Sequence, residues 1–175
     1  WAENTMCDSE RSKNFWELQQ LAFRSHLMSG DCFVIFGMKK NNRTPYELVL
    51  RLLEADRVSS PDSAGDSTVA EGQNGVRIVD GVELARDGEV MAYYIANRHP
   101  LSESSTESLE WVRVAAYGKD TGLPNVLHIT TFERPEQRRG IPFVAAQIEQ
   151  IKQLDRYITS ELAANVVSSM LTAFI

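Results

Sequence analysis

The alternation of apolar and polar positions predicts a helix followed by two strands in the first third of the chain. From Asn14 to Met28, apolar residues recur at the 3.6-residue spacing of one helix face, and Ser29-Gly30 then ends the helix. The next residues, DCFVIFGM, form an apolar run typical of a strand. After a turn at NNRTP, the segment YELVLRLLEADRV predicts a second strand with room for a bend, although its imperfect alternation leaves a helix open.

The middle of the chain has the pattern of several antiparallel strands separated by turns. The segment VRIVDGVELARDGEVMAYYIANRHP contains two β-type runs, and its clearest turn is Asp87-Gly88, a dipeptide typical of hairpins. Two further strands are predicted at WVRVAAY and VLHITTF, with the turn-rich GKDTGLPN between them. Residues 59–75 and 100–109 are polar and poor in large apolar residues, so we expect mobile loops there.

The last part of the chain predicts one unusually long helix. Pro142 is a favourable first residue, and apolar side chains follow on one face at Val144, Ile148, Ile151, Leu154, Ile158 and Leu162. A helix that continues to Phe174 would be about 50 Å long, whereas a domain of this size is about 30–35 Å across. We therefore expect the helix to project or to pack against another chain. From Ala163 onward it is apolar nearly all round, which favours burial between subunits.

Composition limits the class of protein without identifying it. The 175 residues suffice for one well-packed domain or two small ones, and 43% hydrophobic and 24% charged residues are ordinary for a folded protein. With a net charge of -6, the surface as a whole is not expected to bind DNA. Either a local patch would contact DNA, or an acidic wall would repel DNA and keep it from binding tightly. The apolar C-terminal tail is too short and too polar to span a bilayer, so no membrane contact is expected. Because the chain begins at Trp1 and stops within a helical pattern, we expect a piece of a longer protein.

Candidate catalytic chemistry is weak. His128 lies mid-strand with Glu133 nearby, and such a pair can perform acid–base work if a hydrogen bond joins the two side chains. No G-x-S-x-G motif and no cysteine with a matched histidine accompanies them, and a lone strand histidine is usually a packing residue. Two cysteines and three scattered histidines do not suggest zinc, so neither a cofactor nor a metal is expected.

The arginine-rich loop before the long helix is the more open question. Arg134, Arg138 and Arg139 offer guanidinium forks suited to carboxylates or phosphates, but Glu133 and Glu136 nearly cancel their charge. Pairing with a neighbouring copy is therefore favoured over a DNA patch, and a solvated loop that turns at Gly140 stays an alternative. We expect charge reversal at Arg138 or Arg139 to impair assembly without disturbing folding.

Two sets of residues are therefore candidates for subunit contacts. The candidate interface or structural residues of the loop are Glu133, Arg134, Gln137, Arg138, Arg139, Gly140 and Pro142. The candidate interface of the helix consists of Ile151, Leu154, Ile158, Leu162, Val166 and Met170.

Several segments, in this order, resemble the lambda-like portal family of tailed bacteriophages. They are the tryptophan-led start with FWELQQLAFRSHLMSGDCFV, the strand ELVLRLLEADRV, the hairpin IVDGVELARDGEVMAYYI, and VLHITTFERPEQRRGIPFVAAQIEQIKQLDRY. The resemblance runs along nearly the whole chain, and Cys32 departs from it, since the family more usually has a larger residue there.

The resemblance implies a structural protein without catalytic residues. Residues 1–175 would form a single α+β wing region of a longer chain, with antiparallel strands, a hairpin, an N-terminal amphipathic helix and a long C-terminal helix. About twelve copies would form a ring at one capsid vertex, through which DNA is packed and ejected without sequence-specific binding. The implied partners are the large terminase, head-completion and connector proteins, the capsid and the scaffold. The protein would lie in the virion, and in the host cytoplasm during assembly.

Two other classes of function remain open. One is a hydrolase-like enzyme that uses His128 and Glu133, and the other is a monomeric β-rich adaptor domain. The oligomeric state of the protein separates both from a ring-forming subunit.

Overall fold

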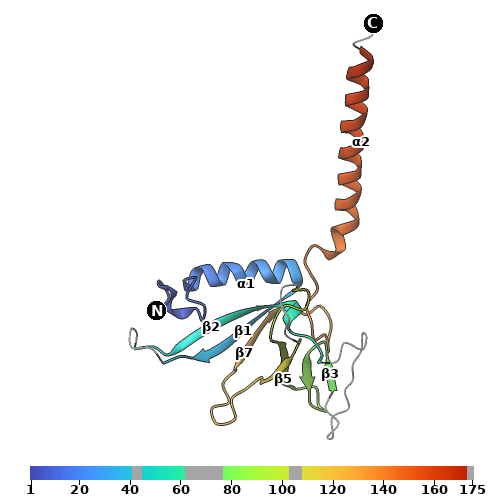
Figure 1. Cartoon of the computed structure of the whole chain (residues 1–175). Coiled ribbons are helices and arrows are strands. Elements are labelled where there is room, and N and C mark those ends of the chain that lie inside the picture. The colour runs from blue at the N-terminus through green and yellow to red at the C-terminus, as the bar shows by residue number, and fades with distance from the viewer. Residues whose placement is uncertain (41–44, 62–76, 103–107, 173–175) are drawn as a thin grey trace. The chain divides into compact units, whose positions relative to one another are not determined.

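The computed structural model describes residues 1–40, 45–61, 77–102 and 108–172 (Figure 1). The chain divides into two compact units, Trp1–Pro142 and Phe143–Ile175, which are treated separately. The first unit contains, in chain order, η1 (Thr5–Cys7), α1 (Phe15–Ser29), β1 (Asp31–Met38), β2 (Leu48–Glu54), η2 (Ala55–Arg57), β3 (Arg77–Val79), β4 (Val82–Leu84), β5 (Val90–Ala96), β6 (Trp111–Ala115) and β7 (Val126–Thr130). The second unit contains η3 (Ala145–Gln147) and α2 (Ile148–Thr172).

The predicted α+β class is confirmed, with antiparallel sheets, an N-terminal helix and a long C-terminal helix. Helix α1 begins with a capping box, in which the Asn14 side chain accepts a hydrogen bond from the Glu17 N–H and the Glu17 carboxylate accepts one from the Asn14 N–H. It ends at Gly30, whose φ of 84° is a left-handed conformation that favours glycine. Leu18 and Ala22 are buried, so one face of the helix covers the sheet beside it.

The first sheet has the strand order β2-β1-β7, and all its pairs are antiparallel. Strand β1 is central, and Phe33 pairs with Leu53 on one side and with His128 on the other. The second predicted strand is confirmed as β2, and the bend follows at once because η2 turns the chain after Glu54. The start of β1, the end of β2 and the end of β7 therefore lie at the same end of the sheet.

The second sheet has the order β3-β4-β5-β6. The predicted Asp87-Gly88 hairpin is confirmed between β4 and β5, where Gly88 has a φ of 88°. The run before it, which we expected to be one strand, contains a second turn at Asp80-Gly81, with φ values of 48° and 82°, and is divided into β3 and β4. This turn carries the same Asp-Gly signal as the first one.

Two apolar clusters hold the first unit together. The larger one joins both sheets and contains Phe33, Leu53, Val58, Val82, Leu84, Tyr93, Ile95, Ala116 and Val126. The smaller one lies under α1 and contains Cys7, Leu18, Val34 and Leu50. Strands β6 and β7 belong to different sheets, so the segment between them carries the chain from one sheet to the other.

The long helix begins later than the sequence suggests. We expected Pro142 to be its first residue, but η3 begins at Ala145 and α2 at Ile148, so this prediction is wrong. Residues 142–144 instead lead through a turn into η3, and the contact of Gly140 and Ile141 with Gly30 lies just before them. With 25 residues, α2 is about 37 Å long. Across the described ranges, none of the helices combines the length and the apolar character needed to cross a bilayer.

Parts of the predicted loops fall outside the described residues. These parts are residues 62–75 of the loop 59–75, residues 103–107 of the loop 100–109, and residues 41–44 of the NNRTP turn.

Candidate functional site

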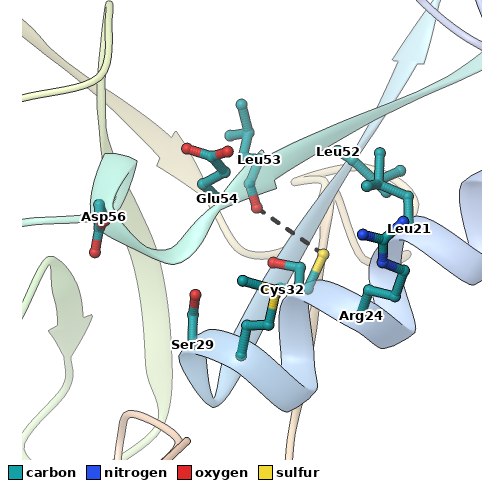
Figure 2. Close-up of a pocket in the computed structure, with 10 residues that line it drawn as sticks. Leu21, Arg24, Ser29, Cys32, Leu52, Leu53, Glu54 and Asp56 are labelled. Carbon is teal, nitrogen blue, oxygen red and sulfur yellow. Dashed lines mark hydrogen bonds between the residues drawn. The ribbon is translucent and has the colours of Figure 1, made fainter. Parts of the chain in front are cut away.

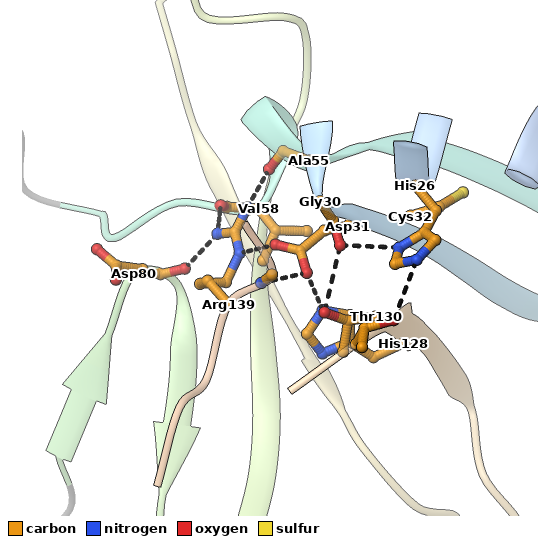
Figure 3. A network of polar contacts seen from close by, with 12 residues as sticks. His26, Gly30, Asp31, Cys32, Ala55, Val58, Asp80, His128, Thr130 and Arg139 are labelled. Carbon is orange, nitrogen blue, oxygen red and sulfur yellow. Dashed lines mark hydrogen bonds and ion pairs between the residues drawn. The ribbon is translucent and has the colours of Figure 1, made fainter. Parts of the chain in front are cut away.

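A buried carboxylate lies where the two sheets meet. Asp31, the first residue of β1, is 1% exposed, and both of its oxygens accept hydrogen bonds (Figure 3). Oδ1 accepts from His128 Nε2 at 2.8 Å and from the Gly140 N–H at 2.7 Å, and Oδ2 accepts from Arg139 Nε at 2.6 Å. Burial alone would raise the pKa of this carboxyl, but the bonds from His128 and Arg139, the Arg139 charge and the Gly140 N–H hold it well below its usual range. Asp31 is therefore ionised at neutral pH.

Arg139 joins this carboxylate to three other segments. Its Nη1 donates to the carbonyls of Val58 and Asp80 at 2.7 and 2.8 Å, and its Nη2 donates to the carbonyl of Ala55 at 2.8 Å. These carbonyls belong to the turn after β2 and to the β3–β4 turn, as Figure 3 shows. The guanidinium carbon also lies 5.4 Å from the centre of the Phe33 ring. One side chain thus ties together both sheets and the loop that precedes the second unit.

His128 completes the network from β7. Its ring stacks on Phe33, with centres 4.2 Å apart and an interplanar angle of 16°. An ionised carboxylate can only accept, so Nε2 carries the hydrogen that His128 donates to Asp31. A second histidine, His26 of α1, contacts the same corner, since its Nδ1 donates to the Gly30 carbonyl at 2.9 Å and its Nε2 accepts from the Thr131 hydroxyl at 3.2 Å.

Two glycines allow this corner to close. A Cβ added to Gly140 would overlap the carbonyl oxygen of Gly30, and one added to Gly30 would lie 2.5 Å from the Gly140 carbonyl carbon. The backbones are therefore in direct contact, and neither position has room for a side chain. This contact keeps the Gly140 N–H within reach of Asp31. We call Asp31, His128, Arg139, Gly30 and Gly140 the Asp31 corner.

The rest of the predicted loop folds on itself around Gln137. The Gln137 Oε1 accepts from the N–H groups of Glu133 and Arg134 at 3.0 and 3.2 Å, and its Nε2 donates to the Arg139 carbonyl at 2.7 Å. Glu133 and Arg134 are exposed, whereas Arg138 is half-buried and its guanidinium lies beside Gly88 in the β4–β5 turn. Pro142 is half-buried at the end of the first unit.

Arg139 thus behaves differently from the sequence expectation. Its guanidinium is paired inside the subunit, so charge reversal there would place two negative groups against each other at the Asp31 corner. We expected such a reversal to leave folding undisturbed, and the Asp31–Arg139 pair contradicts that expectation for this residue.

The geometry gives His128 a partner other than the one expected for catalysis. The side chain is 10% exposed, and the carboxylate that contacts it is Asp31 rather than the candidate Glu133. While its Nε2 hydrogen is donated to Asp31, that nitrogen cannot take up a proton. Across the described ranges, the structure brings together no group of three histidine, cysteine, aspartate or glutamate residues suited to a metal ion.

A shallow hollow of about 430 Å³ lies between α1 and β2 (Figure 2). Its walls are mostly apolar, with Arg24 at one side and Glu54 and Asp56 at the other. Cys32 lies at its base, where Sγ donates to the Leu53 carbonyl at 3.9 Å, a long contact for sulfur. Its side chains converge on no polar centre comparable to the Asp31 corner.

The candidate interface residues of the helix are all on α2 and are all substantially exposed. The exposed fractions range from 48% at Ile158 to 64% at Met170. An isolated helix leaves most of its side chains exposed. These apolar residues therefore differ from the polar groups of the Asp31 corner, which are hydrogen-bonded within the first unit.

Comparison with known proteins decides the family. The model of the family described as phage portal protein, lambda family, matches residues 1–175. The chain is a member of the lambda family of phage portal proteins. It is 23% identical over 178 aligned residues to portal protein B of Escherichia phage lambda, and 22% identical over 177 to the portal protein of Escherichia phage N15. Each alignment covers 100% of this chain and 31% of the relative, so the chain spans about a third of the length of these relatives.

The segments that resemble the portal family are also those that build the Asp31 corner. The GDCFV segment supplies Gly30 and Asp31, VLHITTF supplies His128, and RRGIPF supplies Arg139 and Gly140. In this portal-family chain, segments that are 97 to 109 residues apart in sequence meet at one carboxylate.

Sequence reasoning missed Asp31, although a signal was present. An aspartate at the start of an apolar strand carries a charge into the interior, and such a charge requires a cation and hydrogen-bond donors. His128 and Arg139, which the sequence had marked for other roles, meet that requirement. The sequence could not show that they converge, because the sheet order that brings β1 beside β7 is a tertiary feature.

Proposed function

We propose that this chain belongs to a structural subunit of the portal ring at the unique capsid vertex of a tailed phage. In this proposal, residues 1–175 form one α+β wing region. The observation that carries it is the family match over all 175 residues. The names of the two curated relatives, both portal proteins, agree with it.

The geometry of the first unit supports a structural role. Its most elaborate polar site holds a carboxylate whose oxygens are bound by three donors from the same chain, and this leaves the carboxylate as a fixed anchor. Such an anchor stabilises the corner of the chain that leads from the sheets into the second unit. A rigid corner suits a subunit that must keep its shape while large partners bind and leave.

In the proposed ring, about twelve copies meet through heterologous contacts, in which one patch of a subunit meets a different patch of its neighbour. The exposed loop residues Glu133 and Arg134, together with Arg138 and Pro142, remain candidates for these contacts. Arg139 and Gly140 belong to the Asp31 corner, and Gln137 holds the loop beside it. The exposed apolar residues of α2 are the second candidate set.

The proposed partners are the large terminase, head-completion and connector proteins, the capsid and the scaffold. DNA would pass through the ring without sequence-specific binding, and a net charge of -6 suits a conduit that releases DNA readily. The proposed location is the capsid vertex of the virion, and the host cytoplasm during assembly.

Electron microscopy of the intact protein tests the proposal. We expect closed rings with a central channel, and we expect a solution mass of many subunits that persists on dilution. A protein that stays monomeric across a concentration series would contradict the proposal and would favour an adaptor domain. A hydrolytic activity that disappears in His128→Ala while the protein remains folded would favour an enzyme instead.

A further inference from the structure

The apolar side chains of α2 do not share one face of the helix. From Leu154 to Met170, large apolar residues recur every four positions, at Leu154, Ile158, Leu162, Val166 and Met170. At about 100° per residue, each step of four advances the side chain by about 40° around the axis. The apolar surface therefore winds around the helix and ends on a different side from the one where it begins.

The N-terminal half of α2 has one narrow apolar stripe. Ile151, Leu154 and Ile158 lie within about 60° of one another around the axis, and they are 54%, 57% and 48% exposed. On the opposite side of the same half are the charged residues Lys152 and Arg156. We call Ile151, Leu154 and Ile158 the first stripe.

In the C-terminal half the apolar surface is broader and is centred on the other side, and Leu162 and Val166 extend it back towards the direction of the first stripe. Ala163, Val167 and Met170 also lie within about 60° of one another, and their mean direction is about 150° from that of the first stripe. The direction of the first stripe is occupied here by the polar residues Asn165 and Ser169. Conversely, the charged residues Lys152 and Arg156 occupy the direction of Ala163, Val167 and Met170 in the first half. We call Ala163, Val167 and Met170 the second stripe.

A single partner along one side of α2 cannot cover both stripes. On either side it would bury one stripe and would also remove polar or charged residues of the other half from water. That removal costs free energy unless these residues find hydrogen-bond partners. Two contacts on nearly opposite sides, one for each half, cover both stripes and leave Lys152, Arg156 and Asn165 in water. A subunit of a closed ring has two neighbours on opposite sides, which matches this requirement.

We propose that the first stripe of α2 packs against the second stripe of α2 in the neighbouring copy of this chain, around the ring. This inference rests on the proposed function. The two stripes suit each other, because the first has only bulky side chains and the second begins with the small Ala163, which leaves room between them. No charged residue occurs from Leu162 to Thr172, so the second stripe sets no charge against the first.

The pairing also fixes how neighbouring helices are arranged. The stripes are centred near Leu154 and Val167, which are 13 residues and about 20 Å apart along the helix. Adjacent helices are therefore staggered by about this distance. Copies in a closed ring share one height along the ring axis, so a staggered contact requires each α2 to be inclined to that axis.

Cysteine pairs in the intact protein test this contact. Leu154→Cys is combined, in one chain, with Ala163→Cys, Val167→Cys or Met170→Cys, so that three registers are sampled. These positions are exposed, and the native cysteines are buried with exposed fractions of 0% for Cys7 and 1% for Cys32, which keeps the background low. The control pair, Arg156→Cys with Asn165→Cys, lies in the same two halves of the helix but points away from the proposed contacts.

After mild oxidation of assembled protein, we expect at least one test pair to give a ladder of covalent multimers, with about tenfold more product than the control pair. The single variant Leu154→Cys is expected to give no covalent dimer, because the first stripe meets a different stripe. Covalent dimers from Leu154→Cys alone would overturn the proposal, and so would the absence of multimers from all three pairs in rings seen by electron microscopy. If the unsubstituted protein forms no rings at all, the proposed function fails, and this inference fails with it.

Discussion

The Asp31 corner and helix α2 differ in the surroundings of their side chains. In the corner, one carboxylate accepts hydrogen bonds from His128, Arg139 and Gly140 of the same chain, and the glycine backbones touch. In α2, large apolar side chains are about half exposed. The difference is that the polar groups of the corner are paired within the first unit, whereas the apolar side chains of α2 are exposed in this chain.

Removing the charge at the corner is expected to have the largest effect on stability. In Asp31→Asn, the amide nitrogen faces a hydrogen-bond donor whichever way it is turned, and Arg139 loses its counter-ion. We expect a loss of about 3 to 5 kcal/mol in the free energy of unfolding, measured with a chemical denaturant.

The matched control is Asp120→Asn, which changes an exposed aspartate in a surface turn. We expect its unfolding free energy to stay within about 0.5 kcal/mol of the original. If Asp31→Asn were as mild as this control, the corner would not be the anchor described here.

The close approach of the two glycines is expected to have the next largest effect. Gly30 and Gly122 both have a left-handed φ, of 84° and 64°, but a Cβ meets the Gly140 backbone at Gly30 and meets nothing within 4 Å at Gly122. We expect Gly122→Ala to cost about 1 kcal/mol for backbone strain alone, and Gly30→Ala to cost at least about 2 kcal/mol more. Equal losses in denaturant unfolding would show that backbone strain, and not contact with Gly140, sets the requirement for glycine at position 30.

Acid is expected to weaken the corner gradually. The pKa of Asp31 is lower in the folded protein than the value of about 3.9 in an unfolded chain, so its contribution is fully present above the unfolded value and is lost as the pH falls. We expect the stability difference between the original protein and Asp31→Asn to be constant from about pH 7 to 5 and to shrink below about pH 4. Denaturant unfolding at several pH values measures it, and a difference that is unchanged at about pH 3 would contradict the low pKa.

Much of the fold could be predicted because local patterns and tertiary packing agree there. Asn14, Gly30 and the Asp87-Gly88 turn have backbone requirements that can be read from residue type alone. The Asp80-Gly81 turn was missed although it carries the same Asp-Gly signal, because the strands on either side, β3 and β4, have only three residues each. The start of the long helix was misplaced because Pro142 is locally favourable as a first helical residue, whereas a turn and the short helix η3 come before α2.

The candidate site was predicted less completely. Arg139 and Gly140 were selected from the sequence, but Arg139 was expected to face a neighbour, since the loop offers enough glutamates to suggest pairing between copies. Its actual partner, Asp31, lies 108 residues away, and only the sheet order brings the two together. On α2, the candidate residues are exposed in this chain and wind around the helix, and their contact with a neighbouring copy stays a prediction.

The central claim is that α2 serves contacts between copies while the first unit is stable without them. The most direct measurement is the fraction of the intact protein in rings, counted by electron microscopy, for Ile158→Asp and for the control Gln153→Asp. The account predicts that Ile158→Asp abolishes rings and that Gln153→Asp keeps them, while denaturant unfolding of the first unit changes by less than about 0.5 kcal/mol in both. Rings at the original yield in Ile158→Asp would contradict the claim.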